Sequence, residues 1–398
     1  MKILILSTKM PWPARDGGAI ATLNMALGFA HNNCQVTLLT MNTGKHYFPE
    51  TALPENLRDL ISILSVNVDT KIRPARLILN LFFSRYPYNA QRFISKPFKV
   101  ALENCLAEYD FDIVQLEGPY LSYYIPSIKG KAKIVLRAHN QEHRIWRLMS
   151  NKERNPLKRF YLKILARRIE DLEKKILSEI DFLIPISDAD RKGFDQLGHT
   201  LPVMVIPTGI DISDYPVNED ENSILLFFIG ALDWGPNQEG LDWFFREVWP
   251  EIRIRWPGLT LDIAGRNPAY YFNGRDLPDN VRLEGEVENA IEFFHHHTVM
   301  IVPLLTGSGI RIKILEAMAM GKTVISTRIG AGGLEAMHGE HLYLADTPAE
   351  YVSVLENLQT RQDDLQIMGK KARQFVTENF DILVLSDKLI SFYKEQLV

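Results

Sequence analysis

A strand, loop and helix pattern in the second half of the chain decides the fold. It reads Val299-Met300-Ile301-Val302-Pro303 and, shortly after, Gly307-Ser308-Gly309-Ile310-Arg311-Ile312-Lys313-Ile314-Leu315-Glu316-Ala317-Met318-Ala319-Met320-Gly321-Lys322. The first run is short and apolar, which predicts a buried strand. The Gly-Ser-Gly loop then opens a helical segment that carries two cations and one carboxylate before its apolar end.

The charges of this helical segment predict an anion site. Arg311 and Lys313 lie in or near the first turn, where cations oppose the helix dipole. A bound anion would reverse that penalty, because helix N-termini attract phosphate. The segment is therefore typical of a site for a ligand with phosphate at one end and a group held by Glu316 at the other. The alternative is an amphipathic helix whose charges only face water.

Length and composition indicate a globular protein of two domains. A chain of 398 residues exceeds the roughly 100–200 residues of one domain. Its two cysteines, Cys34 and Cys105, lack metal-type spacing, which favours a reducing compartment. The apolar N-terminus is too short for a signal peptide, and no uncharged apolar run approaches the ~20 residues of a spanning helix. We expect a cytoplasmic location, with the inner face of the plasma membrane as an option.

The charge is divided unevenly between the two halves. Residues 1–205 hold 29 Lys and Arg against 20 Asp and Glu, a balance of +9, whereas residues 206–398 have a balance of −13. Seven cations and no acid lie in residues 71–99, among several Leu, Ile, Phe and Tyr side chains. Such a segment suits an anionic bilayer surface or a lipid-linked substrate. A solvated face around a core helix is an equal alternative, and nucleic acid is disfavoured because no recognised nucleic-acid motif accompanies the segment.

Short apolar runs alternate with helical patterns along the whole chain, which predicts parallel βαβ units. In the first half we expect strands over 3–6, 35–40, 113–116, 134–138, 182–186 and 203–206, and helices over 19–32 and 152–179. In the second half we expect strands over 224–229, 259–264, 281–283, 299–302 and 323–326, a helix over 238–254, and two tail helices over 363–396 that break near Asp381. The acidic stretch 214–221 is the best linker candidate.

Four motifs in order resemble those of family 4 glycosyltransferases. They are the glycine pair Gly17-Gly18, Ala138-His139-Asn140-Gln141-Glu142, Pro207-Thr208-Gly209-Ile210-Asp211, and the stretch from Gly307 to Ala319. The resemblance covers essentially the whole chain and is closest to the bacterial branch that assembles exopolysaccharides and other sugar polymers. It implies the α/β GT-B fold, with two Rossmann-like doubly wound domains facing a cleft.

The resemblance also implies which domain binds which substrate. It predicts an acceptor-side domain over 1–206, onto which a C-terminal helix over 381–398 packs back, and a nucleotide-sugar domain over 207–380. The donor would be a nucleotide-diphosphate sugar and the acceptor a glycan or lipid-linked sugar. Transfer would retain the anomeric configuration and need no metal ion and no cofactor.

Site residues follow from the positions that match the family motifs. The catalytic candidates are His139, Glu142, Arg311 and Lys313. The donor-binding candidates are Gly17, Gly18, Gly230, Asn237, Val287, Gly307, Ser308, Gly309, Glu316 and Gly332. Arg311 and Lys313 would stabilise the leaving diphosphate, and Glu316 would hold the donor ribose. His139 would lie near the transferred sugar, with Glu142 beside it.

Two departures from the family pattern bear on catalysis. Many relatives carry a glutamate where this chain has Ser308, and many carry an Arg and a Lys in the segment that here reads Gly230-Ala231-Leu232-Asp233-Trp234-Gly235-Pro236-Asn237. Arg311 and Lys313 are hypothesised to compensate for those missing cations. His295-His296-His297 resembles a metal cluster, but consecutive helical residues cannot all face one ion, so we interpret the three as surface residues.

The sequence therefore predicts a glycosyltransferase of polysaccharide assembly. Two alternatives stay open: a nucleotide-sugar 2-epimerase with the same donor site, and a donor-binding member of an assembly complex with weakened catalysis. The basic and aromatic segment 71–99 argues mildly against the epimerase. The intact Arg311, Lys313, Glu316 and His139 argue for activity. The sugar, the nucleobase, the acceptor, the linkage and the oligomeric state do not follow from the sequence.

Overall fold

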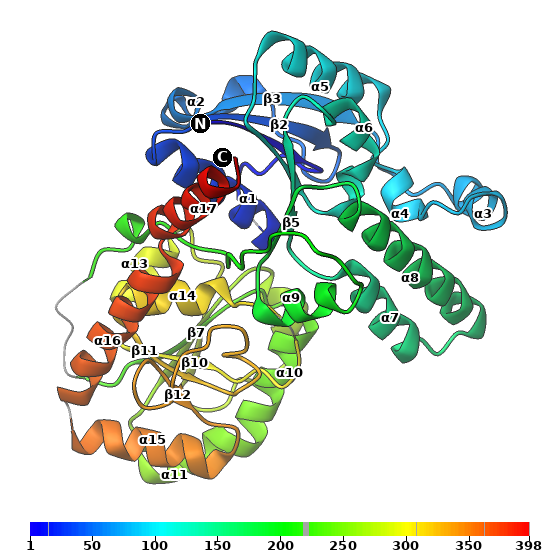
Figure 1. Cartoon of the computed structure of the whole chain (residues 1–398). Helices are drawn as coiled ribbons and strands as arrows, with labels where there is room; N and C mark the ends of the chain where they lie inside the picture. Colours follow the sequence, from blue (N-terminus) through cyan, green and yellow to red (C-terminus); the bar gives the residue numbers. More distant parts are fainter. Residues whose placement is uncertain (15, 218–222, 308, 362, 398) are drawn as a thin grey trace. The chain divides into compact units, whose positions relative to one another are not determined.

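The computed structural model describes residues 1–14, 16–217, 223–307, 309–361 and 363–397. The chain forms two compact units (Figure 1). The first comprises Met1–Gly209 together with Leu385–Val398, and the second comprises Ile210–Val384. Each unit is built on its own six-stranded parallel sheet.

The sheet of the first unit has the strand order β3-β2-β1-β4-β5-β6. Its strands are β1 (Lys2–Ser7), β2 (Gln35–Thr43), β3 (Ser62–Val68), β4 (Ile113–Glu117), β5 (Lys133–Ala138) and β6 (Phe182–Pro185). Every pairing is parallel, and Ile3 of β1 lies opposite Val36 of β2 and Ile113 of β4. The order reverses between β1 and β4, which is the point where doubly wound sheets bind ligands beyond the carboxyl ends of their strands.

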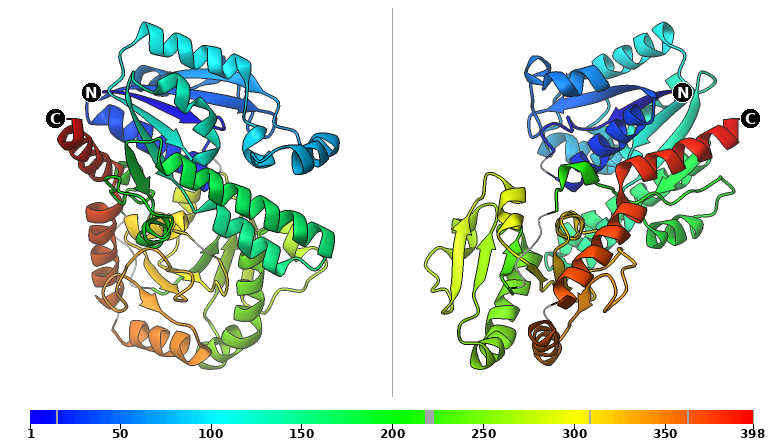
Figure 2. Two further views of the ribbon diagram at one scale, coloured as in Figure 1. Left: turned by 45° about the vertical axis from the view of Figure 1, so that its right-hand side comes forward. Right: turned by 90° about the vertical axis from the view of Figure 1, so that its left-hand side faces the viewer.

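Helices cover both faces of this sheet (Figure 2). The helices of this unit are α1 (Gly17–His31), α2 (Glu55–Leu60), α3 (Pro74–Phe83), α4 (Tyr88–Gln91), α5 (Lys96–Glu108), α6 (Ile125–Ile128), α7 (Glu142–Lys152), α8 (Pro156–Leu177), α9 (Asp188–Asp195) and the C-terminal α17 (Ile382–Leu397). Of these, α3 projects away from the sheet (Figure 2). Leu4 and Leu6 pack into one core cluster and Ile3 and Ile5 into another. Successive side chains of a strand point to opposite faces, so a sheet covered on both sides needs such continuous apolar runs.

The second unit repeats this design with the strand order β12-β11-β10-β7-β8-β9. Its strands are β7 (Leu226–Ile229), β8 (Leu261–Ala264), β9 (Val281–Gly285), β10 (Val299–Val302), β11 (Thr323–Ser326) and β12 (Tyr343–Leu344). Its helices are α10 (Gly235–Trp243), α11 (Trp249–Arg255), α12 (Pro268–Phe272), α13 (Ala290–His295), α14 (Ile312–Ala319), α15 (Pro348–Thr360) and α16 (Asp363–Phe380). Val299 and Ile301 face one core cluster and Met300 and Val302 the other.

Several predicted elements differ in the structure. The helix expected over 152–179 is α8, which begins only at Pro156 because Asn155 caps it by accepting from Leu157 N and Lys158 N. The preceding helix α7, which ends at Lys152, was not predicted. The strand expected over 203–206 is a single bridge from Val203 to Leu183. The helix expected over 238–254 is α10, a π-helical turn over Phe244–Val248, and α11. The break of the tail helices near Asp381 is confirmed.

The interpretation of all three consecutive histidines as surface residues was wrong for His297. Its side chain is buried, with Nδ1 2.7 Å from the Phe293 carbonyl oxygen and Nε2 3.0 Å from Asp262 Oδ2. The imidazole therefore ties the end of α13 to β8, a tertiary contact that the local sequence does not indicate.

No helix in the described part of the chain combines the length and apolar composition needed to cross a bilayer.

Candidate functional site

In the second unit, the predicted donor-binding residues lie beyond one edge of the sheet. Gly230 follows the end of β7, Val287 follows β9, Gly307 and Gly309 follow β10, and Gly332 follows β11. Because all these strands are parallel, their carboxyl ends meet at the same edge. The fold thus brings together loops that are separated by up to about a hundred residues in sequence. Ser308 lies outside the described residues.

Close backbone approaches shape these loops. A Cβ on Gly240 of α10 would lie 2.4 Å from the Pro303 carbonyl oxygen, so this helix can rest against the end of β10 only with glycine there. A Cβ on Gly333, where φ is +85°, would lie 3.3 Å from Ile310 Cγ1. The loop after β11 therefore packs against the loop that leads into α14.

Arg311 occupies the N-cap position of α14, and its own side chain makes no capping hydrogen bond. Its guanidinium donates to the Gly309 carbonyl oxygen at 2.9 Å and lies 5.5 Å from the centre of the Trp234 ring. Burial lowers the pKa of Arg311, but an arginine stays protonated in proteins. A partly desolvated cation thus lies at the N-terminus of a helix, where backbone N–H groups add positive potential.

Lys313 and Glu316 of α14 form a second group with Tyr215, which follows a short turn over Ile212–Asp214. Lys313 Nζ lies 2.7 Å from Glu316 Oε2, and the Tyr215 hydroxyl donates to Glu316 Oε1 at 3.2 Å. Burial, followed by the charge of Glu316, raises the pKa of Tyr215 well above its usual range, so the hydroxyl remains a donor. The carboxylate is held in a defined position, although in this structure the lysine neutralises it.

Asn237 takes part in the turn after β7 rather than projecting freely from it. Its side chain is buried and donates to the Ala231 carbonyl oxygen at 2.9 Å. A Cβ on Gly230 would lie 2.8 Å from Asn237 Nδ2, so the small residue and the amide fit each other. Val287 is half-buried and packs against the core cluster beneath α13 and α14.

In the first unit, His139 directly follows β5 and lies beside the end of the neighbouring strand β4. Its Nε2 is 2.6 Å from Glu117 Oε2, and the imidazole is partly exposed while the carboxylate is buried. Thr22 Oγ1 donates to the same carboxylate at 3.1 Å, Gln115 Nε2 donates at 2.6 Å, and the fully buried Arg137 lies 3.4 Å away.

These partners determine the charge of Glu117. Burial alone would raise the pKa of its carboxyl, but Arg137, His139 and Gln115 outweigh burial and lower that pKa to about 2. The carboxylate is therefore ionised and fixes the orientation of the His139 ring. Tyr393 of α17 extends the network by donating to Gln115 Oε1 at 2.9 Å.

Sequence reasoning missed Glu117. Its signal was present, since Gln115 and Glu117 are two polar residues at alternate positions of a short strand that is otherwise apolar. Alternation places both on one face, and both are buried in the structure. Their partners come from β5, α1 and α17, which no local pattern could have specified.

Glu142 is the first residue of α7, and its carboxylate accepts a hydrogen bond from the Tyr120 hydroxyl at 2.9 Å. Burial raises the pKa of Glu142, and the nearby Glu173 raises it further, against the Tyr120 hydrogen bond. Glu173 itself accepts from the Glu142 backbone N–H at 2.8 Å and lies 2.5 Å from His143 Nδ1. Among the described residues, no hydrogen bond joins Glu142 to His139.

Gly17 and Gly18 begin α1, as a phosphate-binding loop would require, but a side chain caps this helix. The Asp16 carboxylate accepts from Gly18 N at 3.1 Å and Ala19 N at 3.0 Å, and Lys9 forms an ion pair with it. A Cβ on Gly17 would meet nothing within 4 Å, so its backbone is open to a ligand. Gly18 in contrast lies against Lys9 Nζ.

Comparison with known proteins agrees with this architecture. The family model described as Glycosyltransferase Family 4 matches residues 15–214, and the model described as Glycosyl transferases group 1 matches residues 223–361. An uncharacterised 44.6 kDa protein in the cps region of Klebsiella pneumoniae is 25% identical over 412 residues, which cover 96% of each chain.

Solved structures show the same fold at low sequence identity. Sucrose-phosphate synthase from Thermosynechococcus elongatus aligns with a TM-score of 0.69 and 14% identity over 99% of both chains. Anabaena HepE in complex with UDP aligns with a TM-score of 0.66 and 13% identity over 99% of this chain and 100% of that one. The chain therefore belongs to glycosyltransferase family 4, has the two-domain GT-B fold, and is a glycosyltransferase.

Proposed function

We propose that this glycosyltransferase moves a sugar from a nucleotide-diphosphate donor to a glycan or lipid-linked acceptor during assembly of a cell-surface polysaccharide. The observation that carries the proposal is the cluster of Arg311, Lys313 and Glu316 on α14, at the carboxyl edge of the second sheet. Two kinds of relative support it. HepE has been solved with UDP and with UDP-glucose, and the Klebsiella relative lies in a cps region.

In this proposal, contacts with the donor replace the ion pair between Lys313 and Glu316 on α14. Glu316 accepts hydrogen bonds from the ribose hydroxyls, which releases Lys313 from its 2.7 Å contact toward the diphosphate. Arg311 and the backbone N–H groups of Gly307 and Gly309 take the remaining phosphate oxygens. Fixed cations stabilise the charge that develops on the leaving diphosphate, a role for which no metal ion or cofactor is then required.

His139 is assigned to the transferred sugar and the attacking acceptor hydroxyl. The ionised Glu117 holds its ring at 2.6 Å, which fixes the ring orientation before substrate arrives. Departure of the diphosphate and attack on the same face of the sugar would retain the anomeric configuration and place little demand on a strong base. Glu142, bonded to Tyr120, then orients the acceptor rather than acting on His139.

A peripheral membrane contact is proposed for the segment 71–99. On α3 and just before it, five apolar side chains are largely exposed: Ile72, Ile78, Leu79, Phe82 and Phe83. Arg168 of α8 anchors the C-terminal end of this helix by donating to the carbonyl oxygens of Asn80 and Leu81. Exposed apolar side chains on one anchored helix, with the exposed Arg76 among them, fit an anionic bilayer surface.

Sedimentation with phosphatidylglycerol vesicles tests this contact. The double substitution Phe82→Ser and Phe83→Ser should abolish co-sedimentation. The substitution Tyr270→Ser, at an aromatic residue of the second unit that is 74% exposed, serves as the matched control. Equal binding of the first variant and the unsubstituted protein would contradict the proposed contact.

The central experiment incubates the protein with UDP-, GDP- and ADP-sugars, with and without an extract of lipid-linked acceptors. Release of nucleoside diphosphate with transfer or slow hydrolysis supports the proposal. Conversion of the donor sugar to its 2-epimer would identify an epimerase, and binding without turnover would identify a donor-binding member of an assembly. The anomeric proton coupling of the product, measured by NMR, tests retention, and the same assay in excess EDTA tests metal independence.

A further inference from the structure

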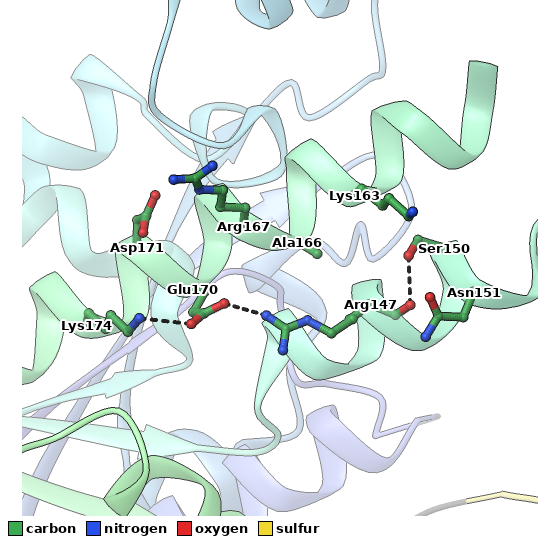
Figure 3. A pocket seen from close by; sticks show the side chains of 9 residues that line it. All are labelled: Arg147, Ser150, Asn151, Lys163, Ala166, Arg167, Glu170, Asp171 and Lys174. Carbon is green, nitrogen blue, oxygen red and sulfur yellow. Dashed lines mark hydrogen bonds and ion pairs between the residues drawn. The ribbon is translucent and has the colours of Figure 1, made fainter. Parts of the chain in front are cut away.

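A groove between α7 and α8 of the first unit lies apart from His139 and its network (Figure 3). It encloses about 540 Å³, within the range of roughly 300–1,000 Å³ that ligand sites occupy. Its lining comes from both helices: Arg147, Ser150, Asn151, Lys163, Ala166, Arg167, Glu170, Asp171 and Lys174. Four of these side chains are cationic and two are acidic, so the groove has a positive balance.

Two of the four cations already share one carboxylate. Glu170 Oε2 lies 2.5 Å from Arg147 NH2, and Glu170 Oε1 lies 2.9 Å from Lys174 Nζ. Hydrogen bonding and charge from Lys174, with a further contribution from Arg147, lower the pKa of Glu170. This group forms one wall of the groove and holds the two helices together.

The other two cations are available to a ligand. Neither Lys163 nor Arg167 has an ion-pair partner among the described residues, and both are exposed. In Figure 3, Lys163 points across the groove toward Ser150 and Asn151 of α7, while Arg167 projects beside Asp171. Below them the small Ala166 is buried and leaves the floor open.

The polar groups around these cations favour a sugar. Asn151 can both donate and accept, Asp171 can accept from hydroxyl groups, and Ser150, which donates to the Arg147 carbonyl oxygen at 2.8 Å, keeps lone pairs free. Among the residues that the structure describes, Ala166 is the one apolar residue of the lining, which disfavours a lipid chain. The two acids disfavour an anion of high charge density such as a diphosphate. They suit a ligand that carries isolated charges among many hydroxyl groups.

We propose that this groove binds an acidic segment of the glycan acceptor, with sugar carboxylates on Lys163 and Arg167 and sugar hydroxyls on Asn151 and Asp171. The proposal rests on the proposed function, since it names the chemical class of the acceptor. It adds a subsite that would hold the growing chain at a distance from the transferred sugar. Binding of this kind weakens as ionic strength rises, because the cations are exposed.

The test is calorimetric titration of the full-length protein with tetragalacturonate and with the neutral maltotetraose. Tetragalacturonate should bind, and maltotetraose should bind at least about tenfold more weakly. The double variant Lys163→Gln, Arg167→Gln should weaken tetragalacturonate binding by about tenfold or more, since each charge-assisted hydrogen bond contributes that order of affinity. Ala166→Leu, which fills the floor without a change of charge, should weaken it as well, with circular dichroism to confirm folding.

The double variant Arg159→Gln, Lys175→Gln is the matched control. It removes the same charge from exposed positions of α8 that do not line the groove, and it should bind tetragalacturonate as the unsubstituted protein does. If both double variants lost tetragalacturonate binding equally, the effect would reflect the overall charge of the protein, and the proposal would be overturned. Equal binding of maltotetraose, or displacement of tetragalacturonate by equimolar pyrophosphate, would also overturn it.

Two further measurements distinguish this acceptor subsite from a membrane contact and from the donor site. If the groove variant lost vesicle binding but kept tetragalacturonate binding, the groove would be a membrane contact and the proposal would fail. Stabilisation of the same variants by UDP reports on the donor site alone. Groove binding without any UDP effect would therefore count against the proposed function, and a UDP effect without groove binding would count against the subsite.

Discussion

At the scale of single residues, Arg311 carries most of the proposed chemistry. It is the cation at the start of α14, and its guanidinium is partly desolvated. The turn after β7 has no cation at the positions where many relatives carry an Arg and a Lys. In that turn Asp233 lies 3.1 Å from Arg266 NH2, so this nearby arginine is already engaged. The positive charge at the donor diphosphate would therefore depend on Arg311 and Lys313.

The substitution Arg311→Ala is expected to lower kcat/KM by about 10²–10³-fold, the usual cost of one group that stabilises developing charge. Turnover of the donor by steady-state release of nucleoside diphosphate measures the effect. Arg282→Ala, at an exposed position on β9, provides the control and should leave turnover unchanged. Near-normal turnover of the Arg311 variant would refute the idea that it compensates for the missing cations.

Glu142 offers a prediction in which stability and activity move in opposite directions. Its pKa in the folded protein is raised by burial and by Glu173, so the ionised form destabilises the native state once the pH rises above the ordinary value for a glutamate. Glu142→Gln should therefore raise the melting temperature at pH 7, whereas the two proteins should converge at pH 4. Transfer activity should fall by about 10²-fold if the carboxylate orients the acceptor.

A lower melting temperature for the Glu142 variant at pH 7 would show that the carboxylate is stabilising and would contradict the direction of its pKa shift. If the variant gained stability as expected but kept full activity, Glu142 would have no role in orienting the acceptor. Glu153→Gln serves as the control for a carboxylate of the same region, since its ion pair with Lys158 lies near the surface.

At the scale of elements, adjacent strand ends create the His139 network. β4 ends at Glu117 and β5 at Ala138, and parallel pairing places Glu117 opposite Arg137. The carboxylate therefore meets one residue of its neighbour strand and the histidine that follows that strand. A parallel sheet with both faces covered buries Glu117 and Arg137, which is why their charges depend on each other.

Glu117→Gln should destabilise the first unit by about 3–5 kcal/mol at neutral pH, because it leaves the buried Arg137 without its counter-charge. The folded-state pKa of about 2 lies below the ordinary value of 4.5, so the carboxylate stabilises the native state above about pH 4.5 and this contribution is lost as the pH falls toward 2. The difference between the two proteins in urea unfolding should shrink over that window. A difference that does not change between pH 6 and pH 3 would contradict the assignment.

At the scale of the whole molecule, the donor site belongs to the second unit, while His139 belongs to the first. Binding of UDP should therefore stabilise the second unit selectively. We expect a rise in its melting temperature, since a ligand at about a hundred times its Kd adds about 2.7 kcal/mol to the free energy of unfolding. Glu316→Gln should reduce the rise with UDP but not with pyrophosphate, which lacks ribose.

Equal reduction with both ligands would show that Glu316 acts on the phosphates or on the fold. The absence of any shift with millimolar UDP, GDP or ADP would contradict the donor site on α14. Lys313→Gln is the companion variant. It removes the ion pair of Glu316, and it should weaken the binding of pyrophosphate more than the binding of the ribose.

The repeated pattern of apolar runs and helical segments was sufficient to predict parallel βαβ units in both halves, the strand before α14, and the helix that carries Lys313 and Glu316. These features are local: buried parallel strands must be continuously apolar, and a glycine loop before a helix is visible in a few consecutive residues. The half-exposed β3, whose side chains are mixed in character, and the two-residue β12 were missed for the same reason, since neither forms a continuous apolar run.

Only the tertiary structure revealed the partners. It placed Glu117 against His139, Tyr393 of α17 on Gln115, and the side chains of two helices around a common groove. Sequence periodicity specifies which side of an element is buried, because burial depends on the spacing of apolar residues along the chain. It cannot specify which distant polar atom meets which, because hydrogen bonds and ion pairs depend on how separate elements come to lie within about 3 Å of one another.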